Sequence, residues 1–165
     1  MQGNGLQDKR VIVLGGSSGI GLEVAKQAAS QGASVVIASS SAERVQKAVE
    51  SVGGKAEGQA VDVSDERATA TFFSKLGTFD HLVFTAGDSL HLHDLAATDL
   101  QQARHAFELR YWAALAAVKY GSPNIRKEGS IVPAPSTGMG NRGKRLRNHR
   151  STNPGPSGRA GTNTG

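Results

Sequence analysis

A glycine-rich turn that follows an apolar strand carries the clearest chemistry in this sequence. Residues 11–14 are a continuous run of Val, Ile and Leu, which is typical of a strand buried on both faces. Gly15, Gly19 and Gly21 follow, and a helix is expected from about residue 20 to 30. The helix N-terminus offers free N–H groups and a positive dipole end, and glycines let a ligand approach the backbone. The turn predicts a dinucleotide pyrophosphate site, and the alternative is a tight turn that binds nothing.

Hydroxyl and guanidinium groups follow the second predicted strand, residues 34–39. Ser39, Ser40 and Ser41 stand at its end, and Arg44 follows one helical turn later. An acidic residue here would bind the ribose of NAD and repel a 2′-phosphate, whereas hydroxyls and a guanidinium suit that phosphate. NADP(H) is therefore favoured over NAD. The alternative is that the serines cap the next helix and Arg44 is a solvated surface charge.

The elements that must position these groups alternate regularly along the chain. Repeated strand–helix–strand units predict a parallel, doubly wound α/β sheet with helices on both faces. The expected strands are residues 11–14, 34–39, 57–63, 80–85 and a fifth from 130, and the expected helices are 20–30, 42–52, 64–77 and 98–120.

The last 33 residues differ in character from the rest. Residues 133–165 hold four of the five prolines and few apolar residues, so we expect a disordered basic tail after a folded domain of residues 1–132. Residues 1–128 carry 13 basic and all 14 acidic residues, and the other six basic residues follow position 128. The tail could bind a polyanion, but it lacks interleaved aromatic residues, so a nucleic acid partner is not favoured.

The motifs and their order resemble the short-chain dehydrogenase/reductase family over residues 9 to about 132. The resemblance rests on Gly15-x-x-x-Gly19-x-Gly21, on Asp62-Val63 after the third strand, and on Ala86-Gly87 after the fourth. Leu14 stands where the family usually has Thr, and Phe84-Thr85 replaces two asparagines. The resemblance implies a Rossmann-like sheet of order 3-2-1-4-5, incomplete on its C-terminal side. A shifted reading frame or a retained intron after Val132 would explain the change of character there.

The resemblance also implies which residues hold the cofactor, with Asp62 beside the adenine. These are Gly15, Ser17, Ser18, Gly19, Ile20, Gly21, Ser39, Ser40, Arg44, Asp62, Val63, Ala86 and Gly87. The family transfers hydride between a nicotinamide and a carbonyl or alcohol carbon, with a tyrosine as general acid/base and a lysine four residues later. Ser136 matches the family's catalytic serine, and Arg110 stands where the family has an asparagine. Arg110 would face the nicotinamide, or would form a structural ion pair with Glu108 or Asp88.

The chain as given contains no Tyr-x-x-x-Lys. Its function is therefore either an NADP(H)-dependent oxidoreductase acting on a small carbonyl or alcohol, or a catalytically silent nucleotide-binding module. We expect Leu109, Trp112, Leu115 and Val118 of the long helix to be partly exposed, which favours a homo-oligomer through that helix. His91-x-His93, with His81 and His105 elsewhere, is weak as a metal site, and no metal is expected. No apolar run suggests a membrane span or signal peptide, so a cytoplasmic location is expected.

Overall fold

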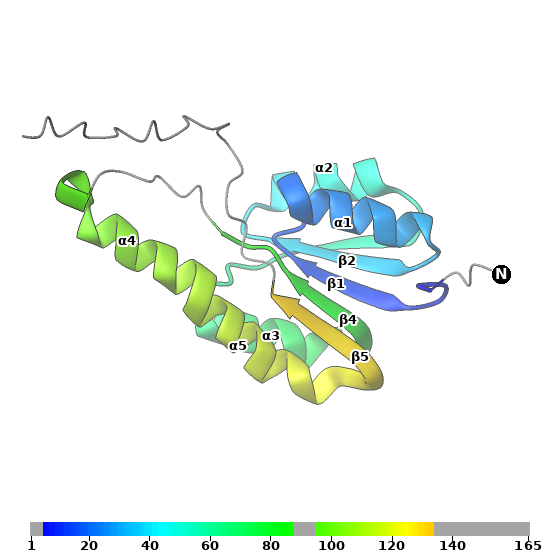
Figure 1. The fold of residues 1–165 in the computed structure, drawn as a ribbon. Coiled ribbons are helices and arrows are strands. Elements are labelled where there is room, and N and C mark those ends of the chain that lie inside the picture. Colours follow the sequence, from blue (N-terminus) through cyan, green and yellow to red (C-terminus); the bar gives the residue numbers. More distant parts are fainter. Residues whose placement is uncertain (1–4, 88–94, 134–165) are drawn as a thin grey trace, which may run out of the picture.

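The computed structural model describes residues 5–87 and 95–133 and contains one five-stranded parallel sheet (Figure 1). The strand order is β3-β2-β1-β4-β5, which confirms the predicted 3-2-1-4-5 order and the Rossmann-like α/β class. The strands are β1 (Arg10–Leu14), β2 (Ser34–Ser39), β3 (Ala56–Ala60), β4 (Phe79–Phe84) and β5 (Ile125–Pro133).

Helices cover both faces of the sheet. They are α1 (Gly19–Ser30), α2 (Ala42–Val52), α3 (Glu66–Leu76), α4 (Leu100–Phe107) and α5 (Ala113–Gly121). Figure 1 shows α1 and α2 on one face, and α3 and α5 on the other. None of the helices in the described parts of the chain is long and apolar enough to cross a bilayer.

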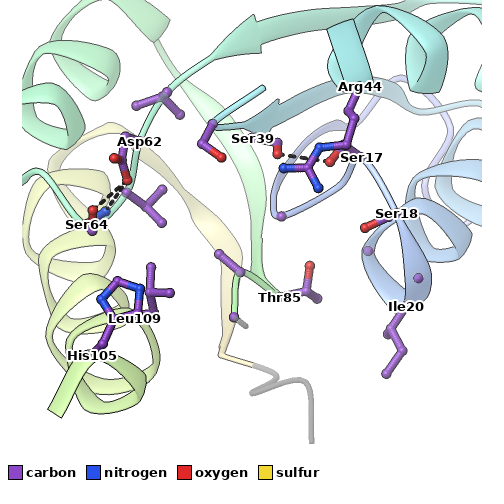
Figure 2. Close-up of a pocket in the computed structure, with 18 residues that line it drawn as sticks. Ser17, Ser18, Ile20, Ser39, Arg44, Asp62, Ser64, Thr85, His105 and Leu109 are labelled. Atoms are coloured by element: carbon purple, nitrogen blue, oxygen red, sulfur yellow. Dashed lines mark hydrogen bonds between the residues drawn. The ribbon is translucent and has the colours of Figure 1, made fainter. Parts of the chain in front are cut away.

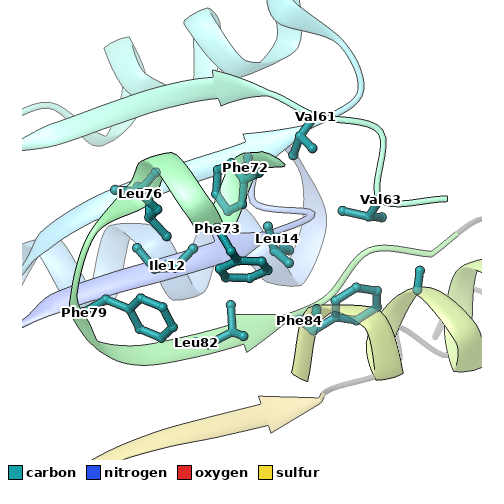
Figure 3. Close-up of a cluster of buried hydrophobic side chains, with 14 residues drawn as sticks. Ile12, Leu14, Val61, Val63, Phe72, Phe73, Leu76, Phe79, Leu82 and Phe84 are labelled. Carbon is teal, nitrogen blue, oxygen red and sulfur yellow. The ribbon is translucent and has the colours of Figure 1, made fainter. Parts of the chain in front are cut away.

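The core consists of two apolar clusters, one on each face of the central strands. Alternate residues of β1 separate them: Ile12 and Leu14 join the cluster under α3 and α5, and Val11 and Val13 join the one under α1. Figure 3 shows the first cluster, in which Phe73 lies between the strands and α3. This packing fixes the C-terminal ends of β1, β2 and β4 relative to one another.

Side-chain caps set the starts of three helices. The Ser41 hydroxyl accepts a hydrogen bond from the Arg44 N–H at 3.3 Å, and α2 begins as predicted. Asp65 accepts from the N–H groups of Arg67 and Ala68, so α3 begins at Glu66. Asp99 caps α4 in the same way.

The expected long helix is divided by a π-helical turn, Glu108–Trp112, between α4 and α5. A π turn inserts one extra residue, which rotates the side chains after it relative to those before it. Leu109, Trp112, Leu115 and Val118 are all at least partly exposed, as expected, and Trp112 and Leu115 are 55% and 49% exposed.

The fifth strand begins at Ile125, five residues before the predicted start. The charged stretch 126–128 hides it in the sequence, because edge strands commonly carry charge. A register shift between β4 and β5 accommodates this stretch, and Arg126 reaches the buried Asp80 of β4 at 2.6 Å.

Asp80 also joins the N-terminal ends of three strands. Its carboxylate accepts the backbone N–H of Arg10 at 2.9 Å and lies 3.5 Å from the Lys9 ammonium. Burial alone would raise the pKa of Asp80, but the Arg10 N–H, Arg126 and Lys9 outweigh it and hold the pKa below its usual value. The cluster closes the end of the sheet opposite the glycine-rich turn.

Candidate functional site

A cavity of about 500 Å³ lies at the C-terminal ends of the central strands (Figure 2). In open parallel sheets this is the edge at which ligands bind. All thirteen residues expected to hold the cofactor line it: Gly15, Ser17, Ser18, Gly19, Ile20, Gly21, Ser39, Ser40, Arg44, Asp62, Val63, Ala86 and Gly87. The fold therefore brings together residues that are up to 72 positions apart, and their role as cofactor ligands stays a prediction.

The three glycines of the turn have different tasks. A Cβ on Gly15, whose φ is 85°, would overlap the backbone of Ala86, and one on Gly21 would overlap the Gly15 carbonyl and the Thr85 hydroxyl. These two positions permit close packing of β1, β4 and α1. Gly19 also has a positive φ, 53°, but nothing lies within 4 Å of its Cβ position. Its open side meets the requirement for a backbone that a pyrophosphate approaches closely.

The serine run at the end of β2 has divided roles. Ser41 caps α2 and is not among the residues that line the cavity. Ser39 and Ser40 do line it, and the Ser39 hydroxyl is 2.9 Å from that of Ser17. The capping alternative therefore holds for Ser41, and phosphate binding by Ser39 and Ser40 stays a prediction.

Arg44 lies on the first turn of α2 and its side chain lines the same cavity. Its neighbour Glu43 is paired with Lys47 at 2.7 Å. Within residues 5–87 and 95–133, the structure pairs no carboxylate with the Arg44 guanidinium. This end of the cavity therefore presents an exposed cation beside two hydroxyl groups, a combination suited to a phosphate monoester.

The opposite end is built from the segment after β3 and from α4. The Asp62 carboxylate accepts the Ser64 N–H at 3.0 Å and the Ser64 hydroxyl at 2.7 Å, which fixes its orientation. Leu109 and His105 line the cavity on the same side as Asp62 and Ser64 (Figure 2). His105 belongs to α4 and Leu109 to the π-helical turn, and no local motif predicts that the packing of these elements places both side chains here.

Thr85 braces the end of β4 where the family commonly has an asparagine. It is buried, and both its N–H and its hydroxyl donate to the Leu14 carbonyl, at 2.8 and 3.0 Å. The hydroxyl therefore tethers β4 to β1 next to the glycine-rich turn. The sequence analysis did not identify this residue as part of the site.

The structure describes only one of the two predicted catalytic residues, Arg110. Ser136 lies outside the described residues, as do His91 and His93. Arg110 is partly buried on the π-helical turn and does not line the cavity. In the described ranges, no group of three His, Asp or Glu residues is arranged to hold a metal ion.

A smaller cavity of about 410 Å³ adjoins the first and shares Val63 and Ser64 with it. The start of α3 forms one side of this cavity, and the π-helical turn and α5 form the other. Here the Glu66 carboxylate accepts hydrogen bonds from the Tyr120 hydroxyl at 2.6 Å and from the Lys119 ammonium at 3.0 Å. These bonds lower the pKa of Glu66, with Tyr120 the larger cause. Trp112 and Leu115 give it an apolar rim.

Comparison with known proteins identifies the fold's relatives. The chain is 32% identical over 148 residues to Short-chain dehydrogenase/reductase fsr5 of Gibberella fujikuroi, covering 81% of this chain and 56% of that protein. It is 30% identical over 140 residues to the uncharacterized oxidoreductase YghA of Escherichia coli, covering 79% and 48%. A solved dehydrogenase/reductase from Sinorhizobium meliloti superposes with a TM-score of 0.71 at 30% identity, covering 78% and 54%.

The chain thus spans about half the length of the curated relatives it matches. The sequence profile of the short chain dehydrogenases matches residues 9–147, which include the whole sheet and the whole cavity described above. From this match, together with the sheet order and the relatives, we conclude that the chain belongs to the short-chain dehydrogenase/reductase family.

Proposed function

We propose that the chain binds NADP(H) in the larger cavity and supplies the nucleotide-binding part of a short-chain oxidoreductase. The observation that carries the proposal is the cavity itself, which joins the open side of Gly19 to the unpaired guanidinium of Arg44. The turn would hold the pyrophosphate, Asp62 would lie beside the adenine, and Ser39, Ser40 and Arg44 would hold the 2′-phosphate. When bound, the cofactor supplies the hydride that this family transfers.

A glycine-to-alanine pair tests the nucleotide site. In Gly19→Ala the new methyl group enters the open side of the turn, where we expect it to keep the pyrophosphate away and weaken NADPH binding at least tenfold. Gly53→Ala is the matched control, because Gly53 also has a positive φ, 68°, and open space at its Cβ position, but lies far from the cavity.

Both variants place an alanine at a positive φ, and Gly53, with φ 68° and ψ −162°, lies in a region that essentially only glycine adopts, so the control should lose at least as much stability as a residue strained only by its φ. NADPH binding is measured by the change in its fluorescence on addition of the whole chain. Equal affinities of the two variants for NADPH would contradict the proposal.

The second candidate function is nucleotide binding without turnover. It is favoured by the sequence, which contains no Tyr-x-x-x-Lys, and by Arg110, which does not line the cavity. For the oxidoreductase function, the substrates that the family implies are small carbonyl or alcohol compounds. The basic residues of the tail, which could bind a polyanion, lie outside the described residues, so the structure does not test that function.

We also propose that a second copy of the chain covers the exposed face of the long helix region. Trp112 and Leu115 are about half exposed and rim the smaller cavity together with Glu108 and Lys119. In an antiparallel contact centred between positions 113 and 114, Trp112 of one copy meets Leu115 of the other. The same register brings Glu108 opposite Lys119, so the face is complementary to itself.

A further inference from the structure

A hydroxyl–hydroxyl hydrogen bond joins two parts of the cavity that lie 22 residues apart. The Ser17 Oγ donates to the Ser39 Oγ at 2.9 Å, and both side chains are half-buried (Figure 2). Ser17 belongs to the glycine-rich turn, whereas Ser39 ends β2. The bond therefore links the expected pyrophosphate site to the position that sets the preference for the ribose substituent.

The backbone around the two serines holds this geometry in place. The Gly15 N–H donates to the Ala38 carbonyl at 2.8 Å, which ties the turn directly to β2. Gly16 is buried against the same strand, and a Cβ there would lie 3.1 Å from the Ile37 Cγ2. The distance between the two hydroxyls is thus set by the turn and strand rather than by the side chains alone.

The hydrogen bond between the two serines determines how many of their O–H groups remain to donate to a ligand in the cavity. Each serine has one O–H hydrogen, and the bond between them uses one of the two. The bond therefore leaves one O–H hydrogen of the pair free to donate to a ligand in the cavity. The Arg44 guanidinium points toward this pair in Figure 2. A phosphate monoester is an acceptor at every oxygen when fully ionised, so it matches a fixed donor next to a cation.

We infer that Ser17 is a positioning residue for the 2′-phosphate of NADP(H), acting by holding the Ser39 hydroxyl in place beside Arg44. The inference rests on the proposed function of the cavity and adds to it a selectivity residue on the glycine-rich turn. The competing explanation is that Ser17 only stabilises the turn. In that case its loss would weaken binding of phosphorylated and unphosphorylated dinucleotides equally.

The test compares affinities for NADPH and NADH, measured by fluorescence titration of the whole chain. Ser17→Ala is expected to weaken NADPH binding about five- to tenfold and NADH binding less than twofold, because a Ser39 hydroxyl that is no longer held in place donates less well to the charged phosphate. Ser17→Thr keeps the hydroxyl and should restore most of the preference. Ser74→Ala is the matched control, because it removes one hydroxyl bond, to the Thr71 carbonyl, on the outer surface of α3.

A double variant separates the two explanations further. If Ser17 acts through Ser39, Ser17→Ala in a Ser39→Ala background should change the NADPH affinity less than twofold. Adenosine 2′,5′-bisphosphate, compared with adenosine 5′-monophosphate, should reproduce the selectivity without the nicotinamide. Equal losses for NADPH and NADH in Ser17→Ala, or additive losses in the double variant, would overturn the inference.

Failure of the proposed function has a different signature. If the unmodified chain binds NADPH no better than NADH, the assignment of the 2′-phosphate to this end of the cavity is wrong. If it prefers NADPH and Ser17→Ala keeps that preference, only the role of Ser17 is wrong. Thermal unfolding of each variant, followed by circular dichroism, shows whether a loss of affinity reflects a loss of fold.

Discussion

At the residue scale, three adjacent serines illustrate how one sequence feature can serve two purposes. Ser41 caps α2, Ser39 is bonded to Ser17, and Ser40 lines the cavity with its hydroxyl available to solvent. The composition of the run predicts both capping and phosphate binding but does not assign them. The direction of the chain as it leaves β2 makes Ser41 the capping residue and leaves Ser39 and Ser40 on the cavity.

Arg44 should decide the choice between the two nicotinamide dinucleotides. In Arg44→Glu a carboxylate replaces the exposed guanidinium, so it would repel a 2′-phosphate and accept from ribose hydroxyls. We expect NADPH affinity to fall by about a hundredfold and NADH affinity to change less than threefold. Fluorescence titration measures both. Arg67→Glu, on the exposed surface of α3, makes the same charge change away from the cavity. An unchanged NADPH affinity in Arg44→Glu would show that the phosphate binds elsewhere.

At the element scale, the ends of the strands have separate roles. The C-terminal ends of β1, β2 and β4 form the cavity, and the N-terminal ends of β1, β4 and β5 are joined through Asp80. Asp80 is thus a structural group remote from the proposed cofactor. Its substitution should change stability rather than nucleotide selectivity.

Asp80→Asn should remove part of the acid sensitivity of the fold. Because the folded-state pKa of Asp80 is lowered, its charge contributes stability that is present above the ordinary pKa of about 4 and is lost as pH falls through the folded value. We expect Asp80→Asn to cost about 3 kcal/mol at pH 7 and progressively less below pH 4. Urea unfolding between pH 2 and 7 measures this, with the exposed Glu50→Gln as control. A loss independent of pH would contradict the prediction.

The exposed face of α5 and the π-helical turn should control self-association. Leu115→Glu places a carboxylate in the proposed contact between two copies, so desolvation would oppose assembly. We expect the dissociation constant of the dimer to rise at least tenfold, measured by sedimentation equilibrium. Gln27→Glu adds the same charge on the exposed surface of α1 and should have no effect. A monomeric unmodified chain would refute this contact.

At the scale of the whole molecule, we expect nucleotide binding to be separable from catalysis. The described residues that line the cavity lie between Gly15 and Leu109, and no Tyr-x-x-x-Lys occurs in the chain as given. A tyrosine needs a neighbouring cation to transfer a proton near neutral pH, and the family supplies it with that lysine. Binding is therefore expected to occur without the hydride transfer step.

The whole chain should be stabilised by NADPH yet fail to oxidise it. At a concentration one hundred times the dissociation constant, a ligand that binds only the folded state adds about 2.7 kcal/mol, which raises Tm by several degrees. We expect this shift, and no loss of NADPH absorbance at 340 nm above background with a panel of small aldehydes and ketones. Carbonyl-dependent oxidation of NADPH would show that other residues supply the proton.

The sequence by itself predicted the βα pattern, and its resemblance to the family implied the sheet order and thirteen of the residues that line the cavity. These follow from apolar periodicity, from glycines at fixed spacing and from family motifs, all of which are local in the chain. It missed the early start of β5, because charged residues on an edge strand look like a loop. Only the tertiary structure placed His105 and Leu109 on the same side of the cavity as Asp62, gave Thr85 the bracing role and paired Ser17 with Ser39. Such contacts depend on how separate elements pack, and local sequence carries no signal for that packing.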